Sequence, residues 1–149
     1  MIIKKNKQGF TLIELLVVLF IIGLLTGIIL PNLIGYRLRA RDASRKRDLE
    51  SIKTSLRMYY NDSQGYLDPV SSDLYEDLVE YMPEVPLDPL GEEYEYCTDD
   101  SNEKFILMAC LENSGDSDIE TSVDRCLTAN ICDPGSCGEG RYAYYVCAN

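Results

Sequence analysis

Residues 9–30 read GFTLIELLVVLFIIGLLTGIIL, and this apolar stretch constrains the whole fold. Glu14 is its one charged residue, and no residue from Leu15 to Leu30 carries a charge. A run of roughly 20 apolar residues is long enough to cross the hydrocarbon core of a membrane as a helix. The sequence therefore predicts a membrane-spanning helix near the N-terminus.

The flanks of this run distinguish it from a removable secretory signal. A secretory signal peptide ends in a small-residue cleavage site after its apolar region. Here the run continues into Pro31 and Asn32, so we expect the helix to remain on the mature protein. The positive-inside rule would place the chain after the helix in the cytoplasm, because more basic residues follow the helix than the three lysines that precede it. This orientation conflicts with a head outside the membrane.

Charge divides the rest of the chain into two parts of opposite sign. Residues 35–57 hold eight basic and three acidic residues, a net charge of +5, whereas residues 58–149 hold three basic and 21 acidic residues, a net charge of −18. The whole chain of 149 residues has a net charge of −11, which argues against a nucleic-acid partner. It has no histidine, so the commonest general base and most catalytic zinc sites are excluded. We expect no catalytic residue and no enzyme activity.

The region around Gly9 resembles the signal of type IV prepilins. A short leader with three lysines ends at Gly9, Phe10 follows, and Glu14 comes four residues later. The resemblance implies that a prepilin peptidase removes the leader, residues 1–9, by cleaving after Gly9, and that it methylates the new amine of Phe10. It also resolves the orientation conflict, because prepilins insert with the leader in the cytoplasm.

Glu14 needs a partner inside an apolar helix, because a carboxylate in lipid costs on the order of 3 kcal/mol. In the pilin family this glutamate faces the N-terminal amine of a neighbouring subunit, which here would be that of Phe10. The alternative is a polar residue that reaches toward the lipid headgroups. Many pilins also have a proline where this chain has Pro31, and a proline inside a helix kinks it or opens a turn. The resemblance thus assigns subunit assembly to Phe10, Glu14 and Pro31.

Two further patterns suggest contacts between subunits. Gly23 and Gly27 are spaced as a G-x-x-x-G pair, which lets neighbouring helices approach closely. Arg37, Arg41 and Arg45 follow at intervals of four residues and repel one another. We expect these arginines to meet lipid headgroups before assembly and acidic heads of adjacent subunits afterwards; the alternative is a solvated helix face.

The predicted fold class is α+β, a long N-terminal helix packed on a small antiparallel sheet, as in pilins. A hydrophobic helix over residues 10–34 continues as an amphipathic helix over residues 35–60, because apolar residues recur there at helical spacing. The globular head comprises residues 61–149. Within it, Asp73 marks the start of a short second helix, and three segments rich in aromatic and apolar residues predict strands: 94–98, 104–112 and 141–147.

Residues 86–96 resemble the D-P-x-G-x-x-Y stretch before the first strand of major pseudopilins. The matching residues are Asp88, Pro89, Gly91 and Tyr94, and the tryptophan often present in that stretch is missing. Proline at the second position and glycine at the fourth also predict a turn.

Six cysteines lie in the last third of the chain, in the part expected outside the cytoplasmic membrane: Cys97, Cys110, Cys126, Cys132, Cys137 and Cys147. An even count in an exported domain predicts up to three disulfides, with 15 possible pairings. Cys132 and Cys137 are close enough in sequence for a local loop. A zinc site is the alternative, but the sequence has no C-x-x-C spacing.

Acidic residues alternate over 116–120, as they do in a calcium loop. The glycine and the closing glutamate of an EF-hand are missing, so a solvated acidic loop is the better prediction. Major pseudopilins bind calcium in a loop of this region; calcium is therefore possible in this head, but no ligand can be assigned to it and no other cofactor is expected.

The resemblance implies a structural subunit of a type IV pilus-like filament that assembles with copies of itself. Its other partners would be the prepilin peptidase and an inner-membrane assembly platform with a cytoplasmic ATPase. The subunit would start as a single-pass protein of the cytoplasmic membrane with its head outside, and end in an extracellular pilus or a periplasmic pseudopilus. The alternatives are a major pseudopilin of a type II secretion or DNA-uptake system, and a signal-anchored extracellular binding module.

Overall fold

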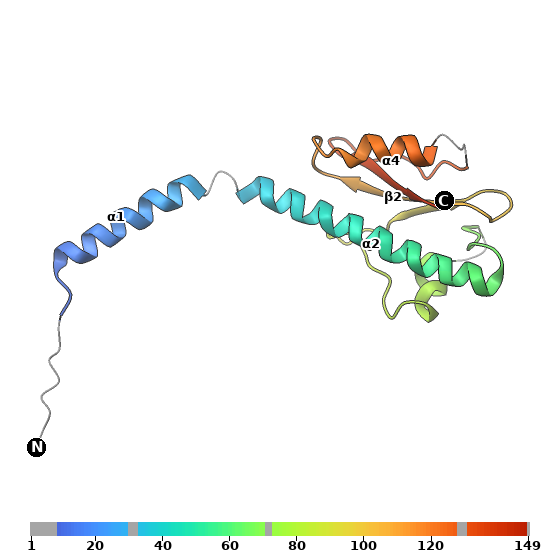
Figure 1. The fold of residues 1–149 in the computed structure, drawn as a ribbon, viewed down its shortest axis with the longest axis horizontal. Coiled ribbons are helices and arrows are strands. Elements are labelled where there is room, and N and C mark those ends of the chain that lie inside the picture. The colour runs from blue at the N-terminus through green and yellow to red at the C-terminus, as the bar shows by residue number, and fades with distance from the viewer. Residues whose placement is uncertain (1–8, 30–32, 71–72, 128–130, 149) are drawn as a thin grey trace, which may run out of the picture. The chain divides into compact units, whose positions relative to one another are not determined.

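The computed structural model describes residues 9–29, 33–70, 73–127 and 131–148. The chain divides into two compact units after Arg37. The first unit contains helix α1, and the second is the head, which contains a three-stranded sheet (Figure 1).

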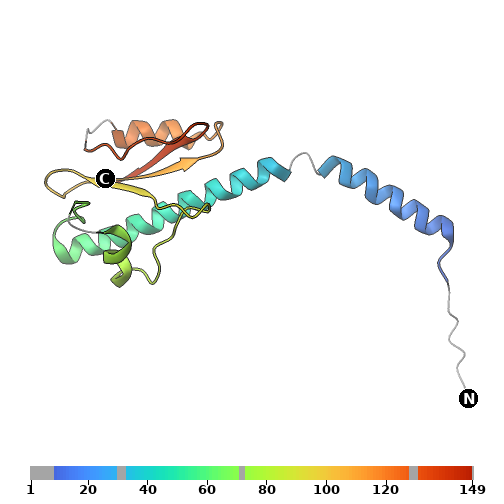
Figure 2. The same cartoon turned by 180° about the vertical axis from the view of Figure 1, so that it is seen from behind.

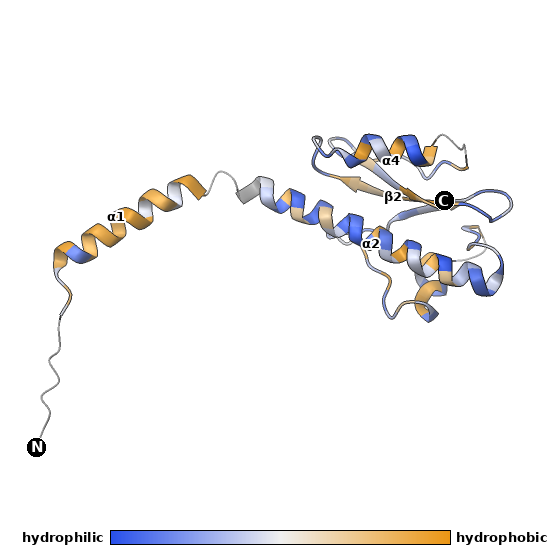
Figure 3. Ribbon diagram, in the orientation of Figure 1, coloured by the Kyte–Doolittle hydropathy of each residue, from blue (hydrophilic) through white to orange (hydrophobic). Residues whose placement is uncertain are grey.

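Helix α1 (Leu12–Ile29) is apolar over almost its whole length. None of its residues is buried in the isolated chain, and Figure 3 colours nearly all of the helix hydrophobic. Its 18 residues span about 27 Å, close to the thickness of the hydrocarbon core of a bilayer. By length and composition, α1 can cross a membrane, as predicted.

Helix α2 (Leu33–Ser63) crosses the division between the units, and its larger part belongs to the head. The apolar side chains that it buries in the head follow helical spacing: Leu49, Ile52 and Leu56. The helix ends three residues beyond the predicted end at Tyr60, where Gln64 turns away with a φ of 59°. The predicted kink at Pro31 lies outside the described residues.

Three antiparallel strands form the sheet in the order β1-β2-β3. They are β1 (Glu95–Thr98), β2 (Phe105–Leu111) and β3 (Tyr142–Cys147). Each strand lies within its predicted segment and differs from it by at most one residue at either end. The α+β prediction is therefore confirmed.

The central strand β2 presents alternate residues to two different layers. Phe105 and Leu107 pack into the same core as the buried face of α2, whereas Ile106 and Met108 pack with Cys126, at the end of helix α4. Figures 1 and 2 show α2 and α4 on opposite faces of the sheet. Because both faces are covered, β2 is apolar throughout and lacks the polar alternation of a strand with one solvated face.

A short helix follows α2 along the chain and precedes the strands of the sheet. The Asp73 carboxylate accepts hydrogen bonds from the backbone N–H groups of Tyr75 and Glu76 and so caps α3 (Leu74–Asp77). A single 3-10 turn, η2 (Leu78–Glu80), follows directly. The predicted second helix is thus confirmed, although most of it is one α-helical turn.

The acidic segment after residue 116 contains a helix, α4 (Asp118–Cys126), which corrects the prediction of a solvated loop. Ile119, Val123 and Cys126 recur at helical spacing and pack against the head. Burial of this small apolar face stabilises the helix while its acids stay on the other side.

All six cysteines form disulfides, as predicted: Cys97–Cys132, Cys110–Cys137 and Cys126–Cys147. Each bridge joins one strand to the segment that runs from the end of α4 toward β3. Local pairing of Cys132 with Cys137 is wrong, because each of them bonds to a strand instead. The bridges close stretches of 35, 27 and 21 residues, which restricts the unfolded chain.

Candidate assembly site

Helix α1 begins with reciprocal hydrogen bonds between Thr11 and Glu14. The Glu14 carboxylate accepts hydrogen bonds from the Thr11 backbone N–H (2.8 Å) and hydroxyl (2.7 Å), and the Glu14 N–H donates to Thr11 Oγ1 (3.3 Å). This arrangement is a capping box, which satisfies the first backbone donors of a helix. The T-x-x-E spacing signals it in the sequence, but both predictions for Glu14, a partner in another subunit and a position near the lipid headgroups, left Thr11 out.

Three further residues predicted to act in assembly, Phe10, Gly23 and Gly27, lie on exposed surface of the first unit, whereas Pro31 lies outside the described residues. Phe10 follows Gly9 and lies two residues before the start of α1, and it is 87% exposed. Gly23 and Gly27 lie one turn apart on α1, and no other part of the described chain comes within 4 Å of where a Cβ would stand. These positions are open to a neighbouring helix, and their roles in assembly stay predictions.

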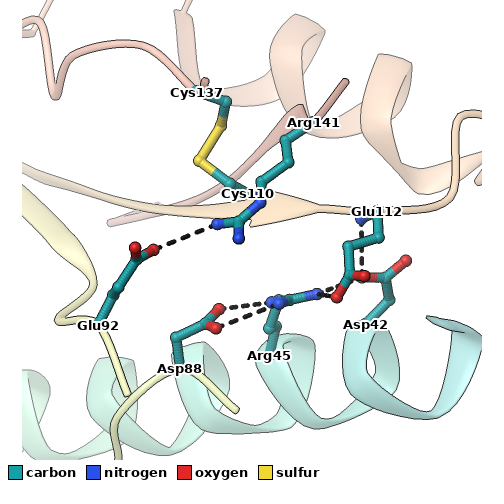
Figure 4. Close-up of a disulfide and its surroundings, with 8 residues drawn as sticks. All are labelled: Asp42, Arg45, Asp88, Glu92, Cys110, Glu112, Cys137 and Arg141. Atoms are coloured by element: carbon teal, nitrogen blue, oxygen red, sulfur yellow. Dashed lines mark hydrogen bonds and ion pairs between the residues drawn. A yellow bond between two sulfur atoms is a disulfide. The ribbon is translucent and has the colours of Figure 1, made fainter. Parts of the chain in front are cut away.

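Arg45 is buried inside the head, which corrects its predicted role. Its exposed fraction is 0%, and three carboxylates of the same chain surround its guanidinium (Figure 4). Nη1 donates to Asp42 Oδ1 (2.7 Å) and Glu112 Oε1 (2.8 Å), while Nε and Nη2 both donate to Asp88. A buried charge requires such partners. Arg45 is therefore not available to an adjacent subunit.

Arg41 is also paired within the head. Its Nε and Nη2 donate to the two carboxylate oxygens of Glu112 at 2.7 and 2.6 Å, a bidentate ion pair. The hydrogen bond from Arg41, with another from Arg45, lowers the pKa of Glu112 to about 2 despite its partial burial. Of the predicted arginine stripe, only Arg37 stays exposed without an ion pair among the described residues, and its contact with another subunit stays a prediction.

Residues 88–94, which we call the pseudopilin-like loop, are attached to α2 at both ends, through Asp88 and through Tyr94. The Gly91 N–H donates to the Asp88 carbonyl (2.7 Å), which closes the predicted turn, and Gly91 has a φ of 88°. Burial would raise the pKa of Asp88, but the hydrogen bonds from Arg45 and the Leu90 N–H, together with the charges of Arg45 and Arg141, lower that pKa. Six residues later, the Tyr94 hydroxyl donates to Asp48 on α2 (2.8 Å).

Asp42 holds the end of the central strand against α2. Its carboxylate accepts hydrogen bonds from the backbone N–H groups of Glu112 and Asn113, both at 2.9 Å. The sequence shows Asp42 three residues before Arg45, a spacing that signals an ion pair within one helix. Asp88 and Glu112 lie 43 and 67 residues from Arg45, so no local spacing in the sequence signals either partner.

Lys46 binds two acids of the candidate calcium loop. Its ammonium group donates to Asp116 (2.6 Å) and Asp118 (2.8 Å), where α4 begins. Within the described ranges, no three His, Cys, Asp or Glu side chains are grouped to hold a metal ion. The acids of this segment thus join α4 to α2.

The N-terminal region matches the family described as "Prokaryotic N-terminal methylation motif" over residues 4–30. The matched range contains the predicted cleavage site after Gly9 as well as Glu14.

Similarity to known proteins extends beyond this motif. The chain is 32% identical to the type II secretion system core protein G of Escherichia coli over 60% of this chain and 70% of that protein. It is 32% identical to core protein G of Vibrio cholerae over 62% of this chain and 73% of that protein. It is 36% identical to the type IV major pilin protein PilA of Myxococcus xanthus over 42% of this chain and 29% of PilA. No solved structure gives a significant match.

The motif, the apolar N-terminal helix and the helix-on-sheet head agree with these similarities. The chain belongs to the family of type IV pilins and type II secretion pseudopilins, whose members are structural subunits and not enzymes.

Proposed function

We propose that the protein is a major pseudopilin, the main subunit of a short periplasmic filament in a type II secretion or related export system. The extent of similarity to core protein G supports this proposal most. A match over 60% of the chain is longer than residues 1–63, so it extends beyond α2 into the rest of the head. The match to PilA covers 63 residues, no more than the leader and the two long helices together. The pseudopilin is therefore favoured over the surface-pilus subunit that the sequence first predicted.

Maturation starts with cleavage after Gly9 by a prepilin peptidase and methylation of the new N-terminus at Phe10. The leader that is removed carries the lysines, so the mature chain begins directly with its apolar segment. Before assembly, α1 anchors the subunit in the cytoplasmic membrane and the head lies outside.

Assembly transfers α1 from lipid into the core of a filament, where the exposed apolar side chains pack against neighbouring copies of the same helix. Glu14 is first satisfied by Thr11 of its own chain. In the filament, the amine of Phe10 in a neighbouring subunit becomes its partner of opposite charge. An assembly platform with a cytoplasmic ATPase supplies the energy for extraction from the membrane.

The first test is the N-terminus of the mature protein. Mass spectrometry should find an N-methylated phenylalanine at Phe10, and Gly9→Val should leave the leader uncut. Gln8→Ala, a change in the leader beside the cleavage site, is the matched control and should be processed normally. A mature protein that starts at Met1 contradicts the proposal.

The second test separates secretion from surface fibres. Deleting the gene should abolish the export of secreted proteins and leave surface pili intact, and the wild-type gene should restore export where the Gly9→Val gene does not. The similarity to PilA makes a type IV pilus subunit the second candidate. Loss of surface pili with normal secretion would favour that candidate.

A further inference from the structure

Helix α2 presents a basic face away from the sheet. Arg39, Arg47 and Arg57 are exposed, and Arg57 follows Arg39 by 18 residues, or five full turns. Arg47 precedes the buried Leu49 by two residues and therefore points to the opposite side of the helix. By the same spacing, Arg39 and Arg57 lie about 80° around the helix from Arg47, on the flank of this side. We call these three arginines the outer face of α2.

The head does not use the outer face for its own stability. No ion pair joins its arginines to any residue that the structure describes. Arg47 donates only to the Ala43 carbonyl of its own helix (3.2 Å). The basic residues that face the sheet are instead paired with acids of the same head: Arg41, Arg45 and Lys46. The charge on the outer face is therefore available to a partner.

An acidic cleft of about 310 Å³ lies elsewhere on the same head. The loop from Asp88 to Glu95, strand β2 and the loop closed by the Cys110–Cys137 disulfide line it, and Figure 4 shows several of these residues. Arg141 on the lining pairs with Glu92 (3.2 Å). The exposed Glu93 and Glu95 form no ion pair with the described residues.

The pairing of the strands explains why the cleft is open. Strand β1 begins at Glu95 and pairs with β2 only from Phe105 to Met108. Residues 109–111 of β2 continue beyond that point with β3 on one side. The chain before Glu95 runs away from this uncovered edge toward the turn at Asp88, and its acids surround the space.

We propose that Arg47 of one subunit enters the acidic cleft of the next subunit and pairs there with Glu93 and Glu95. This inference rests on the proposed function, because it concerns contacts between copies in a filament. The outer face and the cleft are different surfaces of one head, and a contact between different surfaces repeats without closing. Arg39 and Arg57 lie about 12 and 15 Å along the helix from Arg47 and about 80° around it, so they lie to one side of the contact.

A second copy suits this cleft because one chain carries both complementary charges. The segment 35–57 has a net charge of +5, and residues 58–149 have a net charge of −18. A cleft facing another cleft would be repelled, whereas the outer face would be attracted. Complementary charges of this kind select the partner surface and its register.

The test measures filaments of the full-length protein in cells, by chemical cross-linking of neighbouring copies and immunoblot of the cross-linked oligomers. Arg47→Glu should lower the filament yield at least tenfold, because it places a carboxylate against the acidic cleft. Changing both Glu93 and Glu95 to lysine should lower it similarly. The matched controls are Arg125→Glu and Glu120→Lys on exposed positions of α4, which should assemble within twofold of wild type.

The triple variant that combines Arg47→Glu with both lysine substitutions restores opposite charges in every copy. We expect its filament yield to return to within threefold of wild type. Normal assembly of Arg47→Glu, or no recovery in the triple variant, would overturn the docking proposal. If the triple variant does not recover and the Arg47→Glu protein also binds phosphatidylglycerol vesicles less well than wild type, the partner of this arginine is lipid. If the wild type forms filaments and the charge variants contradict the docking proposal, the proposed function still stands. If the wild type forms no filaments, both proposals fail.

Discussion

Replacing Arg45 by methionine tests whether the buried ion network holds the rest of the head against α2. The variant keeps a side chain of similar length but removes the guanidinium that joins Asp42, Asp88 and Glu112. Breaking a buried pair from one side costs about 3–5 kcal/mol, because the remaining charge is left uncompensated. Asp42 and Asp88 keep backbone N–H donors, so we expect the lower end of this range, a loss of about 3 kcal/mol in the free energy of unfolding.

Urea unfolding of the mature protein in mild detergent, followed by the near-ultraviolet circular dichroism of its tyrosines, measures this loss. Arg39→Met is the matched control on the same helix, exposed and outside the network, and should change stability by no more than about 0.5 kcal/mol. Adding Asp88→Asn to Arg45→Met removes a buried charge that has lost its ion-pair partner, while Glu112 keeps its pair with Arg41, and should recover at least half of the loss. A loss below about 1 kcal/mol for Arg45→Met, or no recovery in the combined variant, would refute the reasoning.

Three further predictions follow from individual groups. The hydrogen bonds from Arg41 and Arg45 lower the pKa of Glu112 from 4.5 to about 2, so the stability that its charge contributes is present above pH 4.5 and is lost as the pH falls toward 2. Glu112→Gln should remove this part of the acid sensitivity in urea titrations, and an unchanged pH profile would contradict it. Thr11→Ala removes the hydroxyl from the capping box and should speed hydrogen exchange at the Glu14 N–H about fivefold, corresponding to about 1 kcal/mol, whereas Thr11→Ser should preserve the protection. The paired change of Cys126 and Cys147 to serine should lower stability by about 2–5 kcal/mol, and thiol titration of the wild type without reductant should detect no reactive cysteine.

Helix α2 thus has two chemically different sides. Arg41, Arg45 and Lys46 hold the pseudopilin-like loop, the end of β2 and the start of α4. A basic residue used in this way cannot also pair with another subunit. The outer face of α2 forms no ion pair with the described residues of its own head, so it is the side of the helix that can carry assembly contacts.

Local signals predicted the strands and the short capped helix well. The strands were placed within one residue because dense aromatic and apolar segments are bounded by polar loops. Asp73 caps α3 through hydrogen bonds to residues two and three positions away, so its neighbours in the sequence suffice to identify it. Helix α4 was missed because it holds as many acids as apolar residues, and the contribution of Ile119, Val123 and Cys126 depends on the surface that they cover.

The sequence by itself determined that the chain has an apolar N-terminal helix preceded by a prepilin-like signal, because hydropathy and motif spacing involve only adjacent residues. Only the tertiary structure decided how the cysteines pair and which arginines are buried. Cys97 meets Cys132 across 35 residues, and Arg45 meets Asp88 and Glu112 across 43 and 67. Packing of α2 and α4 on opposite faces of the sheet brings these residues together. Residues far apart in the sequence can form a bond only where packing places their side chains within bonding distance.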